Sequence, residues 1–340
     1  MSKPYINLFT AAFYFALIAC IYSCTKHEDG PQLTNLSELK QTEFVPTLEC
    51  DLTKNKNIIY ASAFLYAWDG VKQLFNSPII PTDANSRDFK LLNNSNSFKN
   101  SLNKNEYEAK ASLTDGKIVS TAMFHLVLPF PSKLQKLDDG ILFDKRKVLA
   151  YGMNYKDDNI IKFTKILFYK DDNNFIIKLN PKDTAHEIIF VKGLQTVKTF
   201  SDAINQTNSL IEEGEKEKRN ANDSWKYEFR DMDDFKIPVI KFNIETDYES
   251  IEGQSFKGNG IMRTVETAYQ RTSLILDENG AIVESVAIDS AKLDSVANPP
   301  KIHPKHMVFD KPFFIIIKKV GKLNPYFLMK VENAELFTEK

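Results

Sequence analysis

The sequence predicts an α+β fold in which helices lie mainly in the N-terminal half and mixed or antiparallel sheets form the rest. Residues 58–75 place apolar and aromatic side chains at three- and four-residue steps, which predicts an amphipathic helix. Short apolar, partly β-branched runs follow from residue 119 onward and indicate successive strands. Asn279-Gly280, between two apolar runs, favours a type I′ β-hairpin. We expect a single domain over residues 44–340.

The first residues are typical of an export signal, and we assign residues 1–23 to a signal peptide. The apolar run of residues 6–22 is short for a membrane span. Cys20 and Cys24 each end a stretch that is similar to a bacterial lipobox, whose cysteine is acylated, for example with palmitate, and becomes the mature N-terminus. Small Ser23 and the polar residues that follow favour Cys24 as the lipidated residue. An uncleaved anchor helix is the alternative.

The residues after Cys24 set the expected location. Thr-Lys-His-Glu-Asp at 25–29 resembles the surface-export signal of Bacteroidetes lipoproteins. The resemblance implies a lipid anchor in the outer membrane and a domain that faces the cell exterior. The polar residues 24–43 predict a flexible stalk. Cleavage would leave Cys50 as the remaining thiol, so no intrachain disulfide is expected.

Strands are expected over residues 119–128, 147–155, 160–169 and 175–179. Asp171-Asp172-Asn173-Asn174 is expected to be a hairpin loop and not a calcium site, because the glycine and terminal glutamate of an EF-hand loop are missing.

Further along the chain, residues 201–213 predict a surface helix with Ser201 as its N-cap. Residues 235–244 predict strand structure, but Pro238 disfavours a central strand because it donates no ladder hydrogen bond.

The sequence carries no recognisable catalytic or cofactor-binding motif. Of its five histidines, His125 lies in an apolar strand pattern and indicates a half-buried core residue. His303 and His306 lie in a proline-containing connection, which does not favour a rigid metal site. We therefore expect no enzyme activity, no catalytic residue, no cofactor and no metal. Forty-four basic against 45 acidic residues, without a long basic run, also argue against a nucleic-acid partner.

The C-terminal third contains the most specific pattern. Residues 309–315 read Phe-Asp-Lys-Pro-Phe-Phe-Ile, and residues 326–333 read Tyr-Phe-Leu-Met-Lys-Val-Glu-Asn. With the acidic-then-glycine stretch at 277–280, they resemble the reactive-loop region and closing strands of serpins, over residues 225–337. The resemblance implies a serpin-like fold and a loop that a serine or cysteine protease cleaves. The N-terminal part of such a loop inserts into the central sheet as a new strand.

The resemblance assigns a hinge to Glu278, Gly280, Ala281, Val283, Ser285 and Ala287. In an inserted strand every second side chain points inward, and from Ala281 to Ala287 these inward residues are small. The next inward residue is Asp289, whose unpaired carboxylate is costly to bury. We therefore expect a loop that can begin to insert and stops near Asp289.

The resemblance also implies an exposed tether over residues 288–308 that contacts proteases or other proteins. The candidate reactive bond lies among Lys292, Leu293, Asp294 and Ser295, and Lys292-Leu293 would suit a trypsin-like protease. Three interpretations stay open. They are a metastable inhibitor, a non-inhibitory relative with a permanent hairpin, and an unrelated β-rich surface lipoprotein that binds ligands through aromatic residues.

Overall fold

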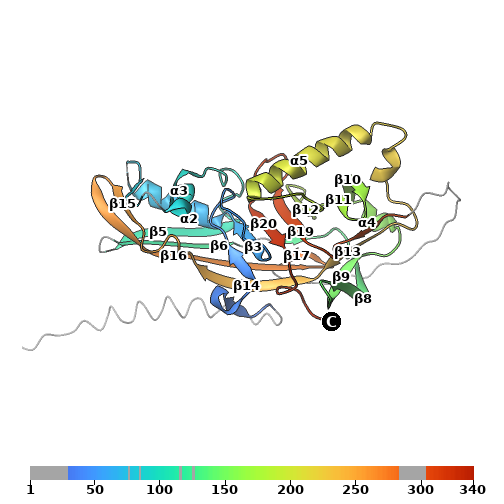
Figure 1. Ribbon diagram of the computed structural model, residues 1–340, viewed down its shortest axis with the longest axis horizontal. Coiled ribbons are helices and arrows are strands. Elements are labelled where there is room, and N and C mark those ends of the chain that lie inside the picture. Colours follow the sequence, from blue (N-terminus) through green and yellow to red (C-terminus); the bar gives the residue numbers. More distant parts are fainter. Residues whose placement is uncertain (1–29, 76, 84–85, 115–116, 125–126, 283–303) are drawn as a thin grey trace, which may run out of the picture. The chain divides into compact units, whose positions relative to one another are not determined.

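Strands dominate the fold and form three sheets, with helices packed on them (Figure 1). The computed structural model describes residues 30–75, 77–83, 86–114, 117–124, 127–282 and 304–340. Within these residues the sheets contain nine, seven and four strands, which we call sheets A, B and C. Each of the three sheets contains both parallel and antiparallel strand pairs. The α+β prediction with mixed sheets is confirmed.

Sheet A is built around one long strand, β16 (Ile261–Asp277). One edge of β16 pairs antiparallel with β14, and the other pairs parallel with β6. The strands around β16 are β1 (Leu33–Asn35), β4 (Ile80–Pro81), β5 (Tyr107–Thr114), β6 (Lys117–Phe124), β7 (Leu128–Pro129), β14 (Ile240–Asp247), β15 (Ser255–Gly258) and β17 (Gly280–Ile282). Its side chains alternate between buried and partly exposed from Ala268 to Leu276, as expected for a strand with one core face.

Two helices, α2 (Ala63–Leu74) and α3 (Arg87–Asn94), belong to the region around sheet A, and α2 packs on β5 and β6 (Figure 1). Trp68 of α2 is fully buried. The predicted helix over 58–75 is wrong at its start, because Asn57–Ala61 forms strand β3 with all five residues buried. An apolar run that is buried on both faces shows no strand period, so periodicity alone does not separate it from the helix that follows.

Sheet B has the order β10-β11-β12-β19-β20-β3-β2. Its strands are β2 (Thr42–Phe44), β3 (Asn57–Ala61), β10 (Thr164–Asp171), β11 (Asn174–Leu179), β12 (His186–Lys192), β19 (Phe313–Lys319) and β20 (Phe327–Val331). A short helix, α4 (Asp158–Ile161), precedes β10. The hairpin loop predicted at 171–174 is confirmed, since the register pairs Asp171 with Asn174.

Helix α5 (Phe200–Glu217) packs on β10 and confirms the predicted surface helix. The predicted N-cap is wrong, because Thr199 and not Ser201 caps the helix. The Thr199 hydroxyl accepts from the Asp202 backbone N–H, and the Asp202 carboxylate accepts from the Thr199 backbone N–H. This reciprocal pair satisfies two helix-end donors, which a lone Ser201 would not do.

Sheet C joins β8 (Gln135–Phe143), β9 (Arg146–Met153), β13 (Asp234–Pro238) and β18 (His306–Val308). Two short 3-10 helices, η1 (Leu36–Glu38) and η2 (Ser224–Tyr227), complete the described elements. Pro238 is the last residue of β13, and strand β14 begins at Ile240. Because β13 lies between β18 and β9, a central strand does contain Pro238, contrary to the expectation. The proline is tolerated because it ends the strand, beyond residues 234–236 that pair with β18.

The prediction of a flexible stalk is wrong for residues 31–43. Strand β1 pairs with β14 at the edge of sheet A, and β2 pairs with β3 at the edge of sheet B. Between them the Glu335 carboxylate accepts from Lys40 N at 2.8 Å and from the Thr42 hydroxyl at 2.7 Å. Sheet edges offer unpaired backbone groups, so a polar segment can be ordered by its backbone alone.

Candidate functional site

The candidate site consists of the two stretches of chain on either side of residues 283–303. Strand β17 leads into this segment and β18 follows it. The segment itself lies outside the described residues, as does the N-terminus up to residue 29. Outside the described part are therefore the predicted residues Val283, Ser285, Ala287, Lys292, Leu293, Asp294, Ser295 and Cys24. The structure brings together Glu278, Gly280 and Ala281 of the predicted hinge.

A tight hairpin joins β16 to β17. Its register pairs Asp277 with Gly280, so Glu278 and Asn279 form the two-residue turn. The hairpin prediction is confirmed, but the turn lies one residue earlier than expected. Neither turn residue has a positive φ, so the turn is not type I′. The Asp277 side chain holds the turn by accepting from Asn279 N at 2.9 Å.

Gly280 is required because the backbone of a neighbouring strand approaches its Cα closely. It has φ +132°, and a Cβ built on it would lie 2.4 Å from the Leu128 carbonyl oxygen and 2.7 Å from Pro129 Cα. Leu128 and Pro129 form β7, which pairs with β17 on the side opposite β16. Any side chain at this position would therefore push β17 away from β7.

The first inward residue of the predicted insertion is buried. Ala281 is paired with Leu276 of β16 and with Leu128 of β7, and all three are at most 3% exposed. Directly paired residues share a face of the sheet, so these side chains form one buried apolar row. This places Ala281 on the inward face, as the alternation predicts.

Strands β6 and β17 lie end to end along the same edge of β16. β6 pairs with β16 from Thr264 to Thr272, and β17 pairs with it from Ile275 to Asp277. On the opposite edge, β14 runs along residues 269–276 of β16. If β17 continued past Ile282 along β16, it would reach the positions that β6 now occupies.

Glu278 is the charged residue of the predicted hinge. Its side chain is 5% exposed and lies 3.0 Å from Lys136 Nζ and 3.4 Å from Lys133 Nζ. Burial raises the pKa of this carboxyl, but hydrogen bonds from its own backbone N–H and from Lys136, with the charges of Lys136 and Lys133, outweigh burial and lower the pKa overall. The turn thus carries an ionised carboxylate compensated by two lysines.

The other end of the segment begins with a buried lysine. Lys305 is fully buried, and its Nζ lies 2.6 Å from Asp233 Oδ2. The same ammonium group donates to the carbonyls of Glu228 at 2.9 Å and Trp225 at 3.3 Å. Burial lowers the pKa of Lys305, although Asp233 acts in the opposite direction.

Strand β18 continues this anchor. It runs parallel to β13, with Met307 opposite Phe235. Buried Lys192 donates to the Val308 carbonyl at 2.7 Å and pairs with Asp310 at 2.6 Å. The predicted tether over 288–308 is therefore wrong for residues 304–308, because backbone pairing and two buried lysines hold them in the fold.

Sequence reasoning did not identify the lysines and the aspartate of these anchors. Lys305 lies in a proline-rich, polar neighbourhood, where a lysine gives no signal of burial. Its partner, Asp233, lies more than seventy residues earlier in another polar stretch. Only the paired strands β13 and β18 bring the two residues together.

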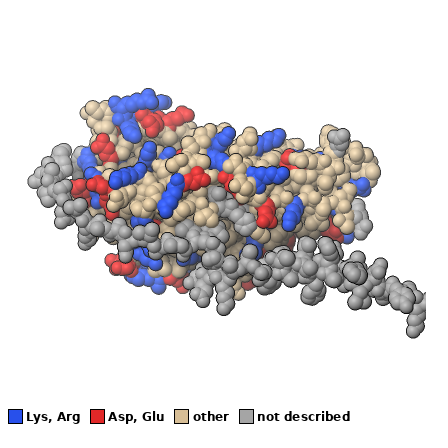
Figure 2. Space-filling model, turned by 180° about the vertical axis from the view of Figure 1, so that it is seen from behind, with Lys and Arg blue, Asp and Glu red and all other residues tan. Residues whose placement is uncertain are grey.

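Within the described part of the chain, no group of three or more His, Cys, Asp or Glu side chains is arranged to hold a metal ion. No described helix is both long and apolar enough to cross a membrane. Basic and acidic side chains are interspersed on the face shown in Figure 2.

Comparisons with known proteins give distant structural similarity alone. No protein-family model and no curated protein matches the sequence. Among solved structures, a serpin from the trematode Schistosoma haematobium is 16% identical with a TM-score of 0.40, over 64% of this chain and 57% of that one. Human thyroxine-binding globulin complexed with thyroxine is 12% identical with a TM-score of 0.40, over 67% and 59%. The thermophilic serpin tengpin in its native state is 11% identical with a TM-score of 0.38, over 63% and 55%. This chain thus covers less than two thirds of each of these structures.

Proposed function

We propose that this chain is a serpin-like module that presents residues 283–303 to a protease or another protein. One observation carries the proposal. Strand β17 lies between β16 and β7, with Ala281 buried, directly before that segment. The closing-strand motif at 309–315, at the far end of the segment, supports the same function.

The two anchors explain how such a module would work. Gly280 fixes one end against β7, and Lys305 fixes the other end in the core. A protein that contacts the segment therefore meets a chain tied to sheet A at one end and to sheet C at the other. Cleavage within the segment would release its first part from the Lys305 anchor and leave it attached to β17.

Whether that released part inserts depends on β6. A longer β17 must replace β6 along β16, starting at the pair Phe124–Thr272. The loss of β6 pairing opposes insertion, and the inward Asp289 opposes its completion. We therefore propose a module that begins to insert and does not trap its protease.

Limited proteolysis tests this function. The purified protein is incubated with a trypsin-like and a subtilisin-like protease, and the products are identified by mass spectrometry and gel electrophoresis in SDS. We expect one early cut within residues 288–303, at Lys292-Leu293 for trypsin, and no SDS-stable complex. A Lys292→Ala variant should lose the tryptic cut, whereas Lys322→Ala, at an exposed lysine near the β19–β20 connection, should keep it. Early cuts elsewhere with this segment intact would refute the proposal.

A different class of function, ligand binding by exposed aromatic residues, is less well supported. Of the large apolar side chains that are exposed in the described part of the chain, one is aromatic, and it belongs to Tyr155. A single aromatic residue does not make a binding face.

We also propose that Cys24 carries the lipid and that the domain is anchored to the outer membrane, facing the exterior. The lipobox-like sequence supports this location. Mass spectrometry of the N-terminal peptide from Cys24→Ala and Cys20→Ala variants tests it. Lipid retained after Cys24→Ala would contradict the assignment.

A further inference from the structure

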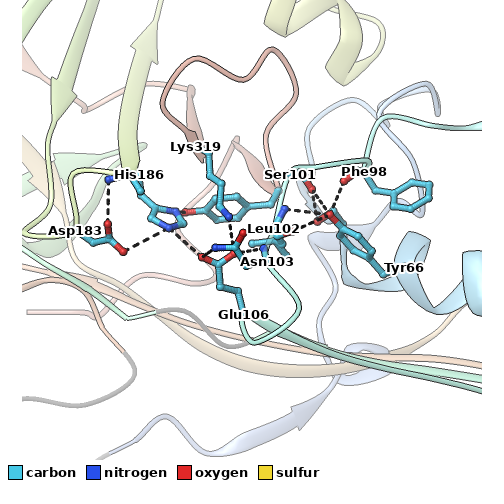
Figure 3. A network of polar contacts seen from close by, with 12 residues as sticks. Tyr66, Phe98, Ser101, Leu102, Asn103, Glu106, Asp183, His186 and Lys319 are labelled. Carbon is cyan, nitrogen blue, oxygen red and sulfur yellow. Dashed lines mark hydrogen bonds and ion pairs between the residues drawn. The ribbon is translucent and has the colours of Figure 1, made fainter.

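A cluster of charged and polar side chains links sheet B to the start of β5 in sheet A (Figure 3). We call His186, Glu106, Asp183, Lys319 and Tyr326 the His186 cluster. His186 begins β12 and is paired with Lys319, the last residue of β19. Glu106 immediately precedes β5. The cluster plays no part in the loop anchors described above.

The imidazole of His186 is 1% exposed and has polar partners on both ring nitrogens. Nε2 lies 3.2 Å from Glu106 Oε1 and 3.6 Å from Asp183 Oδ2. Nδ1 lies 2.8 Å from the Tyr326 hydroxyl. The second oxygen of Glu106 lies 2.9 Å from Lys319 Nζ. Figure 3 shows the side chains of Asp183, Glu106 and Lys319 pointing toward His186 and one another.

The charges around His186 are therefore two carboxylates and one ammonium group. Burial raises the pKa of Tyr326 well above its ordinary value, so that its hydroxyl stays protonated at physiological pH. With a neutral imidazole, the carboxylates of Glu106 and Asp183 exceed the single charge of Lys319. With a protonated imidazole, the charges of the cluster are balanced, and the imidazolium pairs with both carboxylates.

Glu106 lies at the end of the β5–β6 hairpin that is nearest the hinge. The next residue, Tyr107, pairs with Phe124, the last residue of β6. Phe124 in turn pairs with Thr272 of β16. This is the pair that must open first if β17 is to grow at the expense of β6.

The segment before β5 has a second attachment, to helix α2. The Tyr66 hydroxyl donates to the Phe98 carbonyl at 2.6 Å and accepts from Leu102 N at 3.0 Å. The Tyr66 ring also stacks on Tyr107 at a centroid distance of 4.1 Å. These contacts carry no charge, whereas Glu106 attaches the segment through charged side chains.

The loop that supplies Asp183 also contacts the hinge strands. Lys182 N, next to Asp183, donates to the Pro129 carbonyl of β7 at 2.8 Å. β7 is the strand that pairs with β17. The cluster is thus connected both to the strand that would have to move and to the strand that receives β17.

We propose that the His186 cluster is a pH-sensitive latch that holds the hinge end of the β5–β6 hairpin on sheet B, more firmly when His186 is protonated. Histidine is the side chain whose charge ordinarily changes between about pH 5 and pH 8. From a neutral imidazole the bond to Glu106 is an ordinary hydrogen bond, whereas from a protonated imidazole it is charge-assisted and stronger.

The regulatory consequence rests on the proposed function. Opening of β6 from β16 is expected to be rarer at mildly acidic pH, and insertion of the segment after cleavage is expected to be slower there. Acidity would keep the module in the form with β6 in place.

Hydrogen exchange tests the latch without any protease. The full chain is studied at about pH 6 and about pH 8, and amide protection in residues 107–113 and 117–124 is expressed relative to the unfolded-peptide rate at the same pH, which removes the intrinsic pH effect. We expect roughly five- to tenfold higher protection at the lower pH. His186→Gln should abolish this difference. His306→Gln, at an exposed histidine paired with Asp234, should preserve it and is the matched control.

A second variant keeps the test decisive if His186→Gln does not fold. Glu106→Gln keeps the side-chain size, and we expect lower protection at both pH values with little dependence on pH. Equal protection of the wild type at both pH values, or an unchanged pH dependence in His186→Gln and Glu106→Gln, would overturn the latch.

The two proposals fail in different experiments. If the segment is not cut by either protease while protection still depends on His186, the proposed function is wrong and the latch stands. If the segment is cut as expected while protection is independent of pH, the latch is wrong and the proposed function stands.

Discussion

Lys305 and Asp233 form an ion pair with side-chain exposures of 1% and 0%, and Nζ lies 2.6 Å from Oδ2. The carboxylate also accepts from the Lys305 backbone N–H at 2.8 Å, so the same aspartate binds both the backbone and the side chain of Lys305. Lys305 is the second described residue after the 283–303 segment. The described chain on the far side of this segment therefore begins beside a buried ion pair.

Replacing Lys305 by Met should destabilise the fold by about 3–5 kcal/mol, because Asp233 is left buried without its cation. Denaturation by urea measures this loss. Lys311→Met, at an exposed lysine that contacts Asn173, is the matched control and should change the stability by less than about 0.5 kcal/mol. Combining Lys305→Met with Asp233→Leu should recover part of the loss. A Lys305→Met variant as stable as the control would mean that the pair does not hold the chain.

Replacing Gly280 by Ala should detach β17 from β7, because the added Cβ would overlap the Leu128 carbonyl oxygen. The positive φ adds about 1–3 kcal/mol of strain. Hydrogen exchange should show reduced protection in residues 128–134 and 278–282. Gly260→Ala has φ +73° with no atom within 4 Å of the added Cβ, so it carries the backbone strain alone. Equal effects of the two substitutions would mean that the close approach of β7 is unimportant.

The sequence predicted best those strands and helices that have a clear local pattern of apolar residues. The apolar runs that became β9, β11, β19 and β20 are strands in the fold, and α5 was located to within a few residues at each end. The failures have physical reasons. Strand β3 is buried on both faces and merges in sequence with α2. The apolar run at 188–191 of β12 carries a strand signal that the predictions omit.

The candidate site was predictable only in part. The acidic-then-glycine stretch located the turn between β16 and β17 to within one residue, because close backbone approach leaves a local signature at Gly280. The charged residues that hold the two ends of the site have no such signature in the sequence. Lys133 and Lys136 face Glu278 only because the start of β8 and the residues just before it lie beside the turn. Lys305 and Asp233 meet through a parallel strand pair, which no short-range pattern encodes.

Removing the N-terminal strap, residues 31–45, should expose one edge of sheet A and one edge of sheet B. Exposed edges pair with other chains, so a protein that starts at residue 46 should lose stability and associate. A protein that starts at residue 31 should do neither, as analytical ultracentrifugation can show. A monomeric and stable protein from residue 46 onward would mean that the strap is dispensable.

The carboxylate of Glu335 should account for part of the strap's contribution, because it accepts from Lys40 N, Gln41 N and the Thr42 hydroxyl. Glu335→Gln should cost about 1–2 kcal/mol in urea denaturation. Glu339→Gln, at an exposed glutamate in the same C-terminal segment, is the control and should be neutral. A neutral Glu335→Gln would place the stabilisation in the strand pairing alone.

The lowered pKa of Glu278 predicts a pH-dependent contribution to stability with a definite sign. A carboxylate with a lowered pKa in the folded state stabilises that state above its unfolded pKa of about 4.3, and the contribution is lost as the pH falls further. Glu278→Gln should therefore cost about 1–2 kcal/mol at neutral pH, where it removes the charge that Lys133 and Lys136 face. The difference from wild type should shrink below about pH 4.3. Glu266→Gln, which breaks an exposed pair with Lys117, should show a much smaller difference at every pH. Chemical denaturation at neutral and acidic pH measures this cost. If the cost of Glu278→Gln were the same at both pH values, the turn would not depend on an ionised carboxylate, and the two lysines would not stabilise it.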